Sequence, residues 1–301
     1  MIALALVVLA AAHPILPATP VQLVPAEADS IVQAILKSRA ETETWLREAP
    51  NSYLAAIQRV DFGAKELLAV GSSSDNDVRL SGPGITEHHL QVGVEGDRFD
   101  IQALDGRARF KVGDREVREA TVGPSSIGVG RFQIRLSHQG FPALIVFDPR
   151  SPGFASYKGL QFFPPDLQYR YLARLARNPR PDTLVILSTR GNRRRALRVG
   201  WFDFKVAKTP CRLEVTRLLE PGVGESDLSV FFRDATTGKE SYEVGRYVDP
   251  QQQPDGRYLL DFNLAYNPAC AISDHYNCPI PSKANTLKVA IRAGEMDSHY
   301  H

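Results

Sequence analysis

The segment from Phe232 to Glu295 concentrates side chains that could do chemistry. Carboxylates, arginines, amides and tyrosines alternate there with Gly and Pro, in the runs FRDATTGKESYEVGRY and DFNLAYNPACAISDHYNCPIP. Carboxylic acids such as Asp234 and Glu295 act as acid and base in hydrolases when both reach one bond. The same residue types also form buried Asp–Arg pairs and amides that hold irregular loops. The pattern therefore leaves a structural motif, a ligand pocket and a hydrolase site as alternatives.

A set of polar residues in this segment forms the candidate ligand-binding or structural site. The set consists of Arg233, Asp234, Tyr242, Arg246, Tyr247, Asp261, Asn263, Tyr266, Asn267, Asn285 and Glu295. Tyrosines offer an apolar face with a polar tip, and amides both donate and accept hydrogen bonds. Such a set suits a sugar, a peptide or a fragment of a cell-envelope polymer. The pattern implies no cofactor.

The three cysteines add a further constraint. Cys270 and Cys278 would close a short loop, and in an oxidising compartment we expect them to form a disulfide. If Cys270 were a free thiol, His275 could serve it as a base, but the neighbouring Cys278 favours the disulfide. Cys211, in the strand-like run CRLEV, is expected to be a buried thiol. The spacing lacks the CxxC pairs or added histidines of zinc sites, so we predict no metal site.

The beginning of the chain is typical of an export signal. Residues 2–12, IALALVVLAAA, form an uncharged apolar run that is shorter than the roughly 20 residues needed to span a bilayer. The run fits the apolar part of a signal peptide, although no Lys or Arg precedes it. We expect residues 1–20 to be a signal peptide and the protein to be exported, either periplasmic or secreted. A buried N-terminal strand or helix is the alternative.

Composition limits the partners. The formal net charge is +2, so nothing favours a nucleic-acid partner. No segment after the leader is long and apolar enough to be a transmembrane helix. At 301 residues, with 43% apolar residues, the chain can build two domains with separate cores.

The elements that must position the site are mostly strands. Residues 28–48 have helical spacing of apolar side chains and end before Pro50. Residues 62–148 contain seven short strand-like runs separated by turns, which predicts a β-sandwich. Residues 149–182 are predicted to be a connecting segment that contains a helix from Leu167 to Arg177.

Residues 183–298 form the second predicted β-domain. Its first hairpin turns at residues 190–193, RGNR, and its last strand is expected in LKVAIRAGE. We therefore predict a mostly β protein with an N-terminal helix, a β-sandwich, and a second antiparallel β-domain that carries the candidate site.

Residues 71–139 resemble a forkhead-associated domain, a β-sandwich that reads phosphothreonine. The runs GSSSDNDVRL, GITEHHLQV, RFKVGDREV and VGPSSIGVGRFQIRL follow that family's order, with Asn76 and His89 at its positions. Ser72 stands where the family has an arginine that contacts phosphate, and Glu87 replaces another arginine. A dianionic phosphate needs cationic donors. The resemblance therefore implies the sandwich fold, and we do not expect phosphopeptide binding.

The C-terminal half resembles the bacterial domain-of-unknown-function 1684 family, together with the run GLQFFPPDLQYR. The matching residues are Gly159, Leu160, Phe163, Pro164, Asp166, Tyr169, Arg170, Phe232, Arg233, Asp234, Thr237, Gly238, Tyr242, Gly245, Arg246, Tyr247, Asp261, Phe262, Asn263, Ala265, Tyr266, Asn267, Pro268, Cys270, Cys278, Pro279, Pro281, Asn285, Ala293, Gly294 and Glu295. The resemblance implies a fold and a motif but no reaction, because the family's function is unassigned. Members of the family commonly look exported.

We accordingly expect a non-catalytic binding or scaffold protein of the cell envelope or the secreted fraction. Its partner would be a small molecule, a glycan or a protein. The alternative is a hydrolase that acts on an envelope or carbohydrate substrate at a site in the C-terminal domain. Convergence of the candidate side chains on an open pocket would favour a ligand or substrate, and burial in mutual pairs would favour a structural motif.

Overall fold

The computed structural model describes residues 16–300. The apolar run of the predicted signal peptide lies outside these residues. The chain that follows it is held by short β-bridges, from Ala18 to Phe204 and from Pro20 to Tyr171. Within residues 16–300, none of the helices combines the length and the hydropathy that crossing a bilayer requires.

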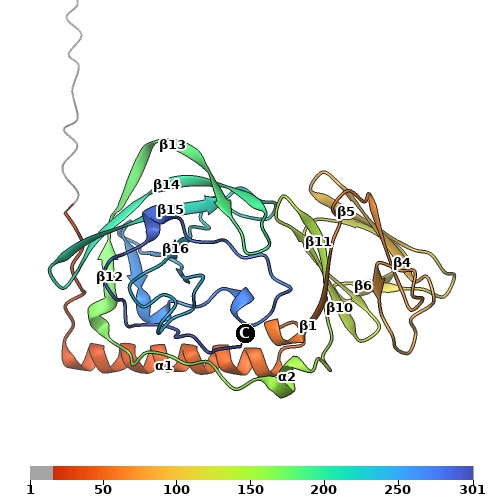
Figure 1. Ribbon diagram of the computed structural model, residues 1–301, viewed down its shortest axis with the longest axis horizontal. Coiled ribbons are helices and arrows are strands. Elements are labelled where there is room, and N and C mark those ends of the chain that lie inside the picture. Colours follow the sequence, from red (N-terminus) through yellow and green to blue (C-terminus); the bar gives the residue numbers. More distant parts are fainter. Residues whose placement is uncertain (1–15, 301) are drawn as a thin grey trace, which may run out of the picture.

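Helix α1 spans Pro25–Glu48 and is the longest helix of the described chain. Proline is well suited to a first helical turn, which explains a start at Pro25 rather than at residue 28. The Glu27 carboxylate accepts a hydrogen bond from the Val24 N–H at 3.4 Å. Helix α1 lies along one edge of the larger lobe in Figure 1 and buries Ile35 and Leu46.

A β-sandwich follows α1 and forms the second lobe of Figure 1. Its elements are η1 Tyr53–Ala55, β1 Ala56–Asp61, β2 Leu67–Gly71, β3 Val78–Arg79, β4 Leu90–Glu95, β5 Arg98–Ala103, β6 Phe110–Val112, β7 Arg115–Val117, β8 Glu119–Val122, β9 Ser125–Val129, β10 Phe132–His138 and β11 Pro142–Phe147. One sheet has the order β1-β11-β10-β9-β6-β7, and the other has the order β3-β2-β4-β5-β8.

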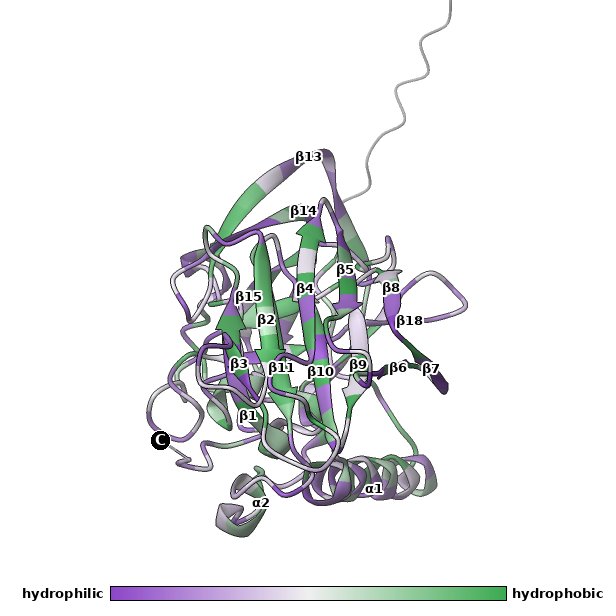
Figure 2. Cartoon of the chain, turned by 90° about the vertical axis from the view of Figure 1, so that its right-hand side faces the viewer, coloured by the Kyte–Doolittle hydropathy of each residue, from purple (hydrophilic) through white to green (hydrophobic). Residues whose placement is uncertain are grey.

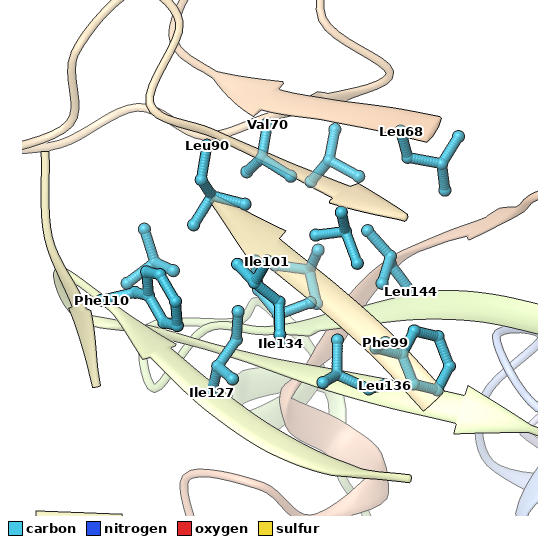
Figure 3. Close-up of a cluster of buried hydrophobic side chains, with 14 of the residues drawn as sticks. Leu68, Val70, Leu90, Phe99, Ile101, Phe110, Ile127, Ile134, Leu136 and Leu144 are labelled. Carbon is cyan, nitrogen blue, oxygen red and sulfur yellow. The ribbon is translucent and has the colours of Figure 1, made fainter. Parts of the chain in front are cut away.

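Alternating side chains fill the space between these two sheets. Along β4 and β10 hydrophobic and hydrophilic residues take turns, as Figure 2 shows, and the inward residues are buried. Figure 3 shows Leu68, Val70, Phe99 and Ile134 meeting in this core. In a strand, every second side chain points to the same face of the sheet. The apolar residues of the predicted strands therefore face each other between the two sheets, as expected for a sandwich.

The loops that resemble the forkhead-associated family are tied to their own backbone. The Asn76 amide donates to the carbonyl oxygens of Ser73, at 2.9 Å, and of Glu87, at 2.8 Å. His89 is buried, and its Nε2 lies 2.9 Å from the Arg109 carbonyl oxygen. The polar side chains at these two family positions therefore stabilise the loops.

The larger lobe contains the remaining elements. They are α2 Gly153–Ser156, η2 Leu167–Tyr169, β12 Arg170–Ala173, β13 Leu175–Leu187, β14 Arg193–Val206, β15 Thr209–Leu218, β16 Val230–Phe232, β17 Arg246–Val248, β18 Gln251–Gln252, β19 Tyr258–Asp261, η3 Phe262–Leu264, η4 Ala269–Ala271 and η5 Lys283–Asn285. Three sheets result, with the orders β13-β14-β15, β12-β19-β18 and β16-β17. Aromatic residues Phe204, Phe232 and Phe262 pack between them.

Two predicted elements of this lobe are wrong. The helix predicted from Leu167 to Arg177 is a single 3-10 turn, after which β12 pairs with β19 and buries Tyr171. Asp166 does cap the turn, but pairing in a sheet outweighs the local helix signal. The predicted last strand, LKVAIRAGE, is irregular chain rather than a strand. Strands β12 and β13 also begin inside the segment that we predicted to be a connector.

The two lobes share a hydrophobic contact. Ile145 and Phe147 of β11 pack with Phe231, Tyr247 and Tyr276 of the larger lobe. The sandwich therefore packs against the part of the larger lobe that contains the candidate site.

Candidate functional site

The structure separates the candidate residues into a buried scaffold and a pocket. Arg246 is the centre of the scaffold and is 1% exposed. Its guanidinium donates to Asp234 Oδ2 at 3.3 Å and to the carbonyl oxygens of Ile291 at 2.7 Å and Glu295 at 3.1 Å. Asp234 in turn accepts from the Thr236 hydroxyl at 2.7 Å. The C-terminal segment forms no strand there, and the Arg246 guanidinium binds its carbonyl oxygens instead. The Arg246–Asp234 pair therefore has a structural role.

Other candidates also satisfy backbone groups. Asn285 accepts from the Glu214 N–H at 2.6 Å and donates to the Phe231 carbonyl oxygen at 2.8 Å, which joins β15 to β16. Arg233 Nε donates to the Val244 carbonyl oxygen at 2.9 Å. The Tyr247 hydroxyl donates to the carbonyl oxygen of Pro279. These side chains hold loops together and do not converge on a common point.

The remaining candidates, apart from Tyr242, do converge on one pocket. A cavity of about 390 Å³ lies between α1 and the segments that follow β17 and β19. The candidate residues in its lining are Asp261, Asn263, Tyr266, Asn267 and Glu295. The cavity is within the size range of small-molecule sites.

Glu295 has the most strongly perturbed carboxyl group of this pocket. Its side chain is 6% exposed, and burial raises its pKa to about 7. The Asn267 N–H donates to Glu295 Oε2 at 2.8 Å, and this bond and the charge of Arg246 lower the pKa, but burial dominates. Glu295 can therefore give or take a proton near neutral pH.

A second acid lies at the pocket mouth. Asp249 is solvent-exposed, and the Tyr266 hydroxyl donates to its Oδ2 at 3.0 Å. Neighbouring protein atoms partly desolvate the Asp249 carboxyl group, which raises its pKa, and the hydrogen bond from Tyr266 lowers it by less. Burial and this carboxylate raise the pKa of Tyr266. The pair presents a carboxylate and a phenol ring to a ligand.

Asp261 is not available to a ligand in the same way. It forms an ion pair with Arg170, and its Oδ1 accepts from the Asn263 N–H and side-chain amide, both at 3.0 Å. These bonds fix the turn after β19. Asn263 also joins this turn to the Asp166 backbone, with 2.7 Å and 2.9 Å hydrogen bonds.

Helix α1 supplies a cation to the pocket. Arg39 donates to the carbonyl oxygens of Phe163 at 2.9 Å and Asn263 at 3.3 Å, and its guanidinium lies over the Phe162 ring. Burial lowers the pKa of Arg39, whereas Asp261 and Glu295 raise it. The side chain stays cationic, because arginine is effectively always protonated in proteins.

Two buried polar atoms of the lining lack a hydrogen-bond partner within residues 16–300. They are the donor Nε of Arg39 and the acceptor Oδ1 of Asn267. Buried polar groups are normally paired, so these two atoms are exceptions at the cavity wall, and their burial keeps them out of contact with the cavity itself.

The sequence did not point to several residues of the pocket. Arg39 and Trp45 come from α1, Tyr53 from η1, and Asp249 from the loop after β17. The Arg39 contact to Asn263 spans 224 residues. Trp45 has helical spacing with other apolar residues, which predicts a buried side chain, yet it is 37% exposed in the structure.

Cys270 and Cys278 are thiols in the structure rather than a disulfide. The Cys270 N–H donates to Cys278 Sγ at 3.4 Å, so the residues are adjacent as predicted. Tyr242, the remaining candidate, places its hydroxyl 3.9 Å from Cys270 Sγ. Cys270 and Tyr242 line a cavity other than the one under α1.

Comparison with known proteins gives four findings. Residues 155–296 match the family described as protein of unknown function (DUF1684). The solution structure of an uncharacterized protein from Haloarcula marismortui is 37% identical, over 49% of this chain and 80% of that one, with a TM-score of 0.39. Mycobacterium tuberculosis EmbR in complex with a low-affinity phosphopeptide is 17% identical, over 42% and 32%, with a TM-score of 0.22. No curated protein matches.

Proposed function

Since the chain belongs to the DUF1684 family through residues 155–296, whose activity is unassigned, we propose a function from the pocket itself. The protein binds a small, uncharged glycan under α1 and acts as a binding protein rather than an enzyme. The lining of the cavity carries this proposal, because the aromatic rings of Trp45 and Tyr53 stand beside the polar side chain of Glu295. A sugar hydroxyl both donates and accepts hydrogen bonds, so it suits a lining that offers both donors and acceptors.

The wall of the pocket also fits a sugar. Trp45 and Tyr53 meet edge to face, with ring centroids 4.9 Å apart, and both line the cavity. Aromatic rings of this kind offer an apolar surface next to polar groups, which suits the mixed faces of a sugar ring. Below pH 7 the Glu295 carboxyl is mostly protonated, so it can donate to a neutral ligand.

A hydrolase is the second candidate, and one observation favours it. The pKa of about 7 gives Glu295 the proton affinity of a general acid. A glycosidase needs a second carboxylate across the bond. Asp234 is held by Arg246, and Asp261 by Arg170 and Asn263, so Asp249 is the remaining pocket carboxylate.

Calorimetric titration with neutral chito-oligosaccharides tests the binding function. Trp45→Ala should weaken binding of the ligand that is found by about 2 kcal/mol, roughly thirtyfold in Kd. The matched control is Trp201→Ala, which removes the other tryptophan and lies outside the pocket. Equal binding by both variants would contradict the assignment of the pocket.

An assay for reducing sugar, run with the same ligands, separates the two candidate functions. Release of reducing sugar by the wild type, lost in Glu295→Gln with binding retained, would establish the hydrolase. Binding without turnover in both proteins would establish the binding protein.

We also propose that the protein is exported, on the basis of the apolar run at residues 2–12. Expression of the full chain with cell fractionation and N-terminal sequencing of the product tests this proposal. An uncleaved chain in the cytoplasmic fraction would overturn it.

A further inference from the structure

Cys270 and Cys278 lie together at a second cavity of about 930 Å³, which shares no lining residue with the pocket under α1. Cys270 lines this cavity with Tyr242 and Thr189. Cys278 lies behind it, 7% exposed, where its Sγ accepts from the Cys270 N–H at 3.4 Å. The arrangement places one thiol at the cavity wall and a second one within its reach.

Hydrogen-bond donors surround the Cys270 sulfur. The Cys278 thiol, the Tyr242 hydroxyl and the Thr189 hydroxyl all interact with it, and the Cys278 bond contributes most to lowering the pKa of Cys270. Donors stabilise a thiolate, because a thiolate is an acceptor. The bond to Cys270 and then burial raise the pKa of Cys278. The pair is therefore asymmetric, with the negative charge favoured on the sulfur that faces the cavity.

We propose that Cys270 and Cys278 form a redox-active dithiol that reduces a peroxide. Cys270 is the nucleophile, and Cys278 is the resolving thiol. This activity is separate from ligand binding under α1.

The reaction balances in two steps. The Cys270 thiolate attacks one oxygen of hydrogen peroxide, the O–O bond breaks, and the leaving hydroxide takes a proton to become water. Cys270 is now a sulfenic acid. Cys278 then attacks the Cys270 sulfur, displaces hydroxide and transfers its own proton to it, which gives the disulfide and a second water. Overall, one peroxide is reduced to two waters, and the dithiol is oxidised to a disulfide.

The position of the pair suits this small oxidant. Cys270 is 6% exposed, so a large disulfide substrate would meet steric hindrance at its sulfur, whereas a peroxide is little larger than water. Formation of the disulfide also requires little movement, because Cys270 and Cys278 are already in contact as thiols.

Cys211 provides an internal contrast. It lies on β15 and is 8% exposed, so it is buried to a similar degree. Burial raises the pKa of Cys211, and the thiol donates to the Thr209 carbonyl oxygen at 3.6 Å. Cys211 therefore lacks the stabilised thiolate.

The test is oxidation of the reduced, folded protein by hydrogen peroxide, followed by mass spectrometry of its peptides. We expect loss of two hydrogen atoms from the peptide pair that contains Cys270 and Cys278, at least about tenfold faster than oxidation of Cys211. In Cys278→Ser, dimedone should trap a sulfenic acid at Cys270. Circular dichroism checks that this variant is folded.

A pair of tyrosine variants tests the geometry. Tyr242→Phe removes a donor to the Cys270 sulfur and should slow its oxidation severalfold. The control Tyr300→Phe lines the same cavity but loses a bond to the Gly159 carbonyl oxygen, so its rate should match the wild type. If Cys270 in the wild type reacts no faster than Cys211, or no faster than in urea-unfolded protein, the proposal is overturned.

Discussion

Replacing Glu295 by glutamine should make the protein more stable at alkaline pH. In the folded state burial raises the pKa of Glu295 to about 7, whereas the unfolded chain has the ordinary value of 4.5. Between these values the folded protein keeps a proton that the unfolded chain releases. The folded state binds more protons, so this group lowers stability as pH rises. Glutamine resembles the protonated acid and can still accept the Asn267 N–H bond.

The size of the effect follows from the two pKa values. They differ by about 2.5, which at about 1.4 kcal/mol per pKa unit corresponds to about 3 kcal/mol. Below pH 4.5 the acid is protonated in both states, so the wild type and Glu295→Gln should be equally stable. Above pH 7 the full difference is present. A carboxylate with a depressed pKa would show the opposite trend.

The assay is urea unfolding of both proteins from pH 4 to pH 8.5, compared as the difference in unfolding free energy. The difference should grow from zero to about 3 kcal/mol in favour of Glu295→Gln. Glu225→Gln, at a side chain that is 99% exposed, is the control and should follow the wild type. A difference that stays constant with pH would refute the assigned pKa of Glu295, and with it the role of this residue as a proton donor to a ligand.

Three further predictions concern the scaffold. Asp234→Asn leaves the Arg246 cation buried without its partner and should cost about 3–5 kcal/mol in urea unfolding; a loss below about 1 kcal/mol would show that the backbone carbonyls suffice. Oxidation of Cys270 and Cys278 to a disulfide should raise the free energy of unfolding by about 2.5 kcal/mol, measured by denaturation with and without reductant, and equal stability would indicate a strained bond. Gly294→Ala places a Cβ 2.4 Å from a carbonyl oxygen at a φ of +80°, so its melting temperature should fall as about 3 kcal/mol are lost; an unchanged melting temperature would contradict this geometry.

Alternation of apolar residues and turn residues predicted the fold correctly where the strands that they indicate also find partners in a sheet. The alternation in the sandwich strands and the turn at residues 190–193 reappear as strands and as the loop between β13 and β14. The signal failed where a distant segment decided the outcome. Residues 170–173 follow a helix cap, but β19 offers them a sheet partner. The segment from 287 to 295 has strand-like alternation, but the Arg246 guanidinium takes its carbonyl groups instead.

The candidate site was predicted as a set of residues but not as a set of roles. Asp234 and Glu295 look alike in the sequence, yet one is paired with a buried arginine and the other faces a cavity. Charge, burial and neighbours determine what a carboxyl group does, and these depend on contacts far apart in the chain. Arg39 and Trp45 show the same limit, because their place in the pocket depends on how α1 docks on the larger lobe.

The docking of α1 has a consequence for the architecture of the chain. The sandwich begins after η1 and ends at β11, where the Asp148 N–H donates to the Ala55 carbonyl oxygen at 2.9 Å, so its entrance and exit are neighbours. The sandwich therefore lies in the sequence between α1 and the remaining elements of the larger lobe. A fragment that starts at residue 155 carries the family match but lacks the wall formed by Arg39, Trp45 and Tyr53. The pocket under α1 is thus built from two stretches of chain that the sandwich separates in the sequence.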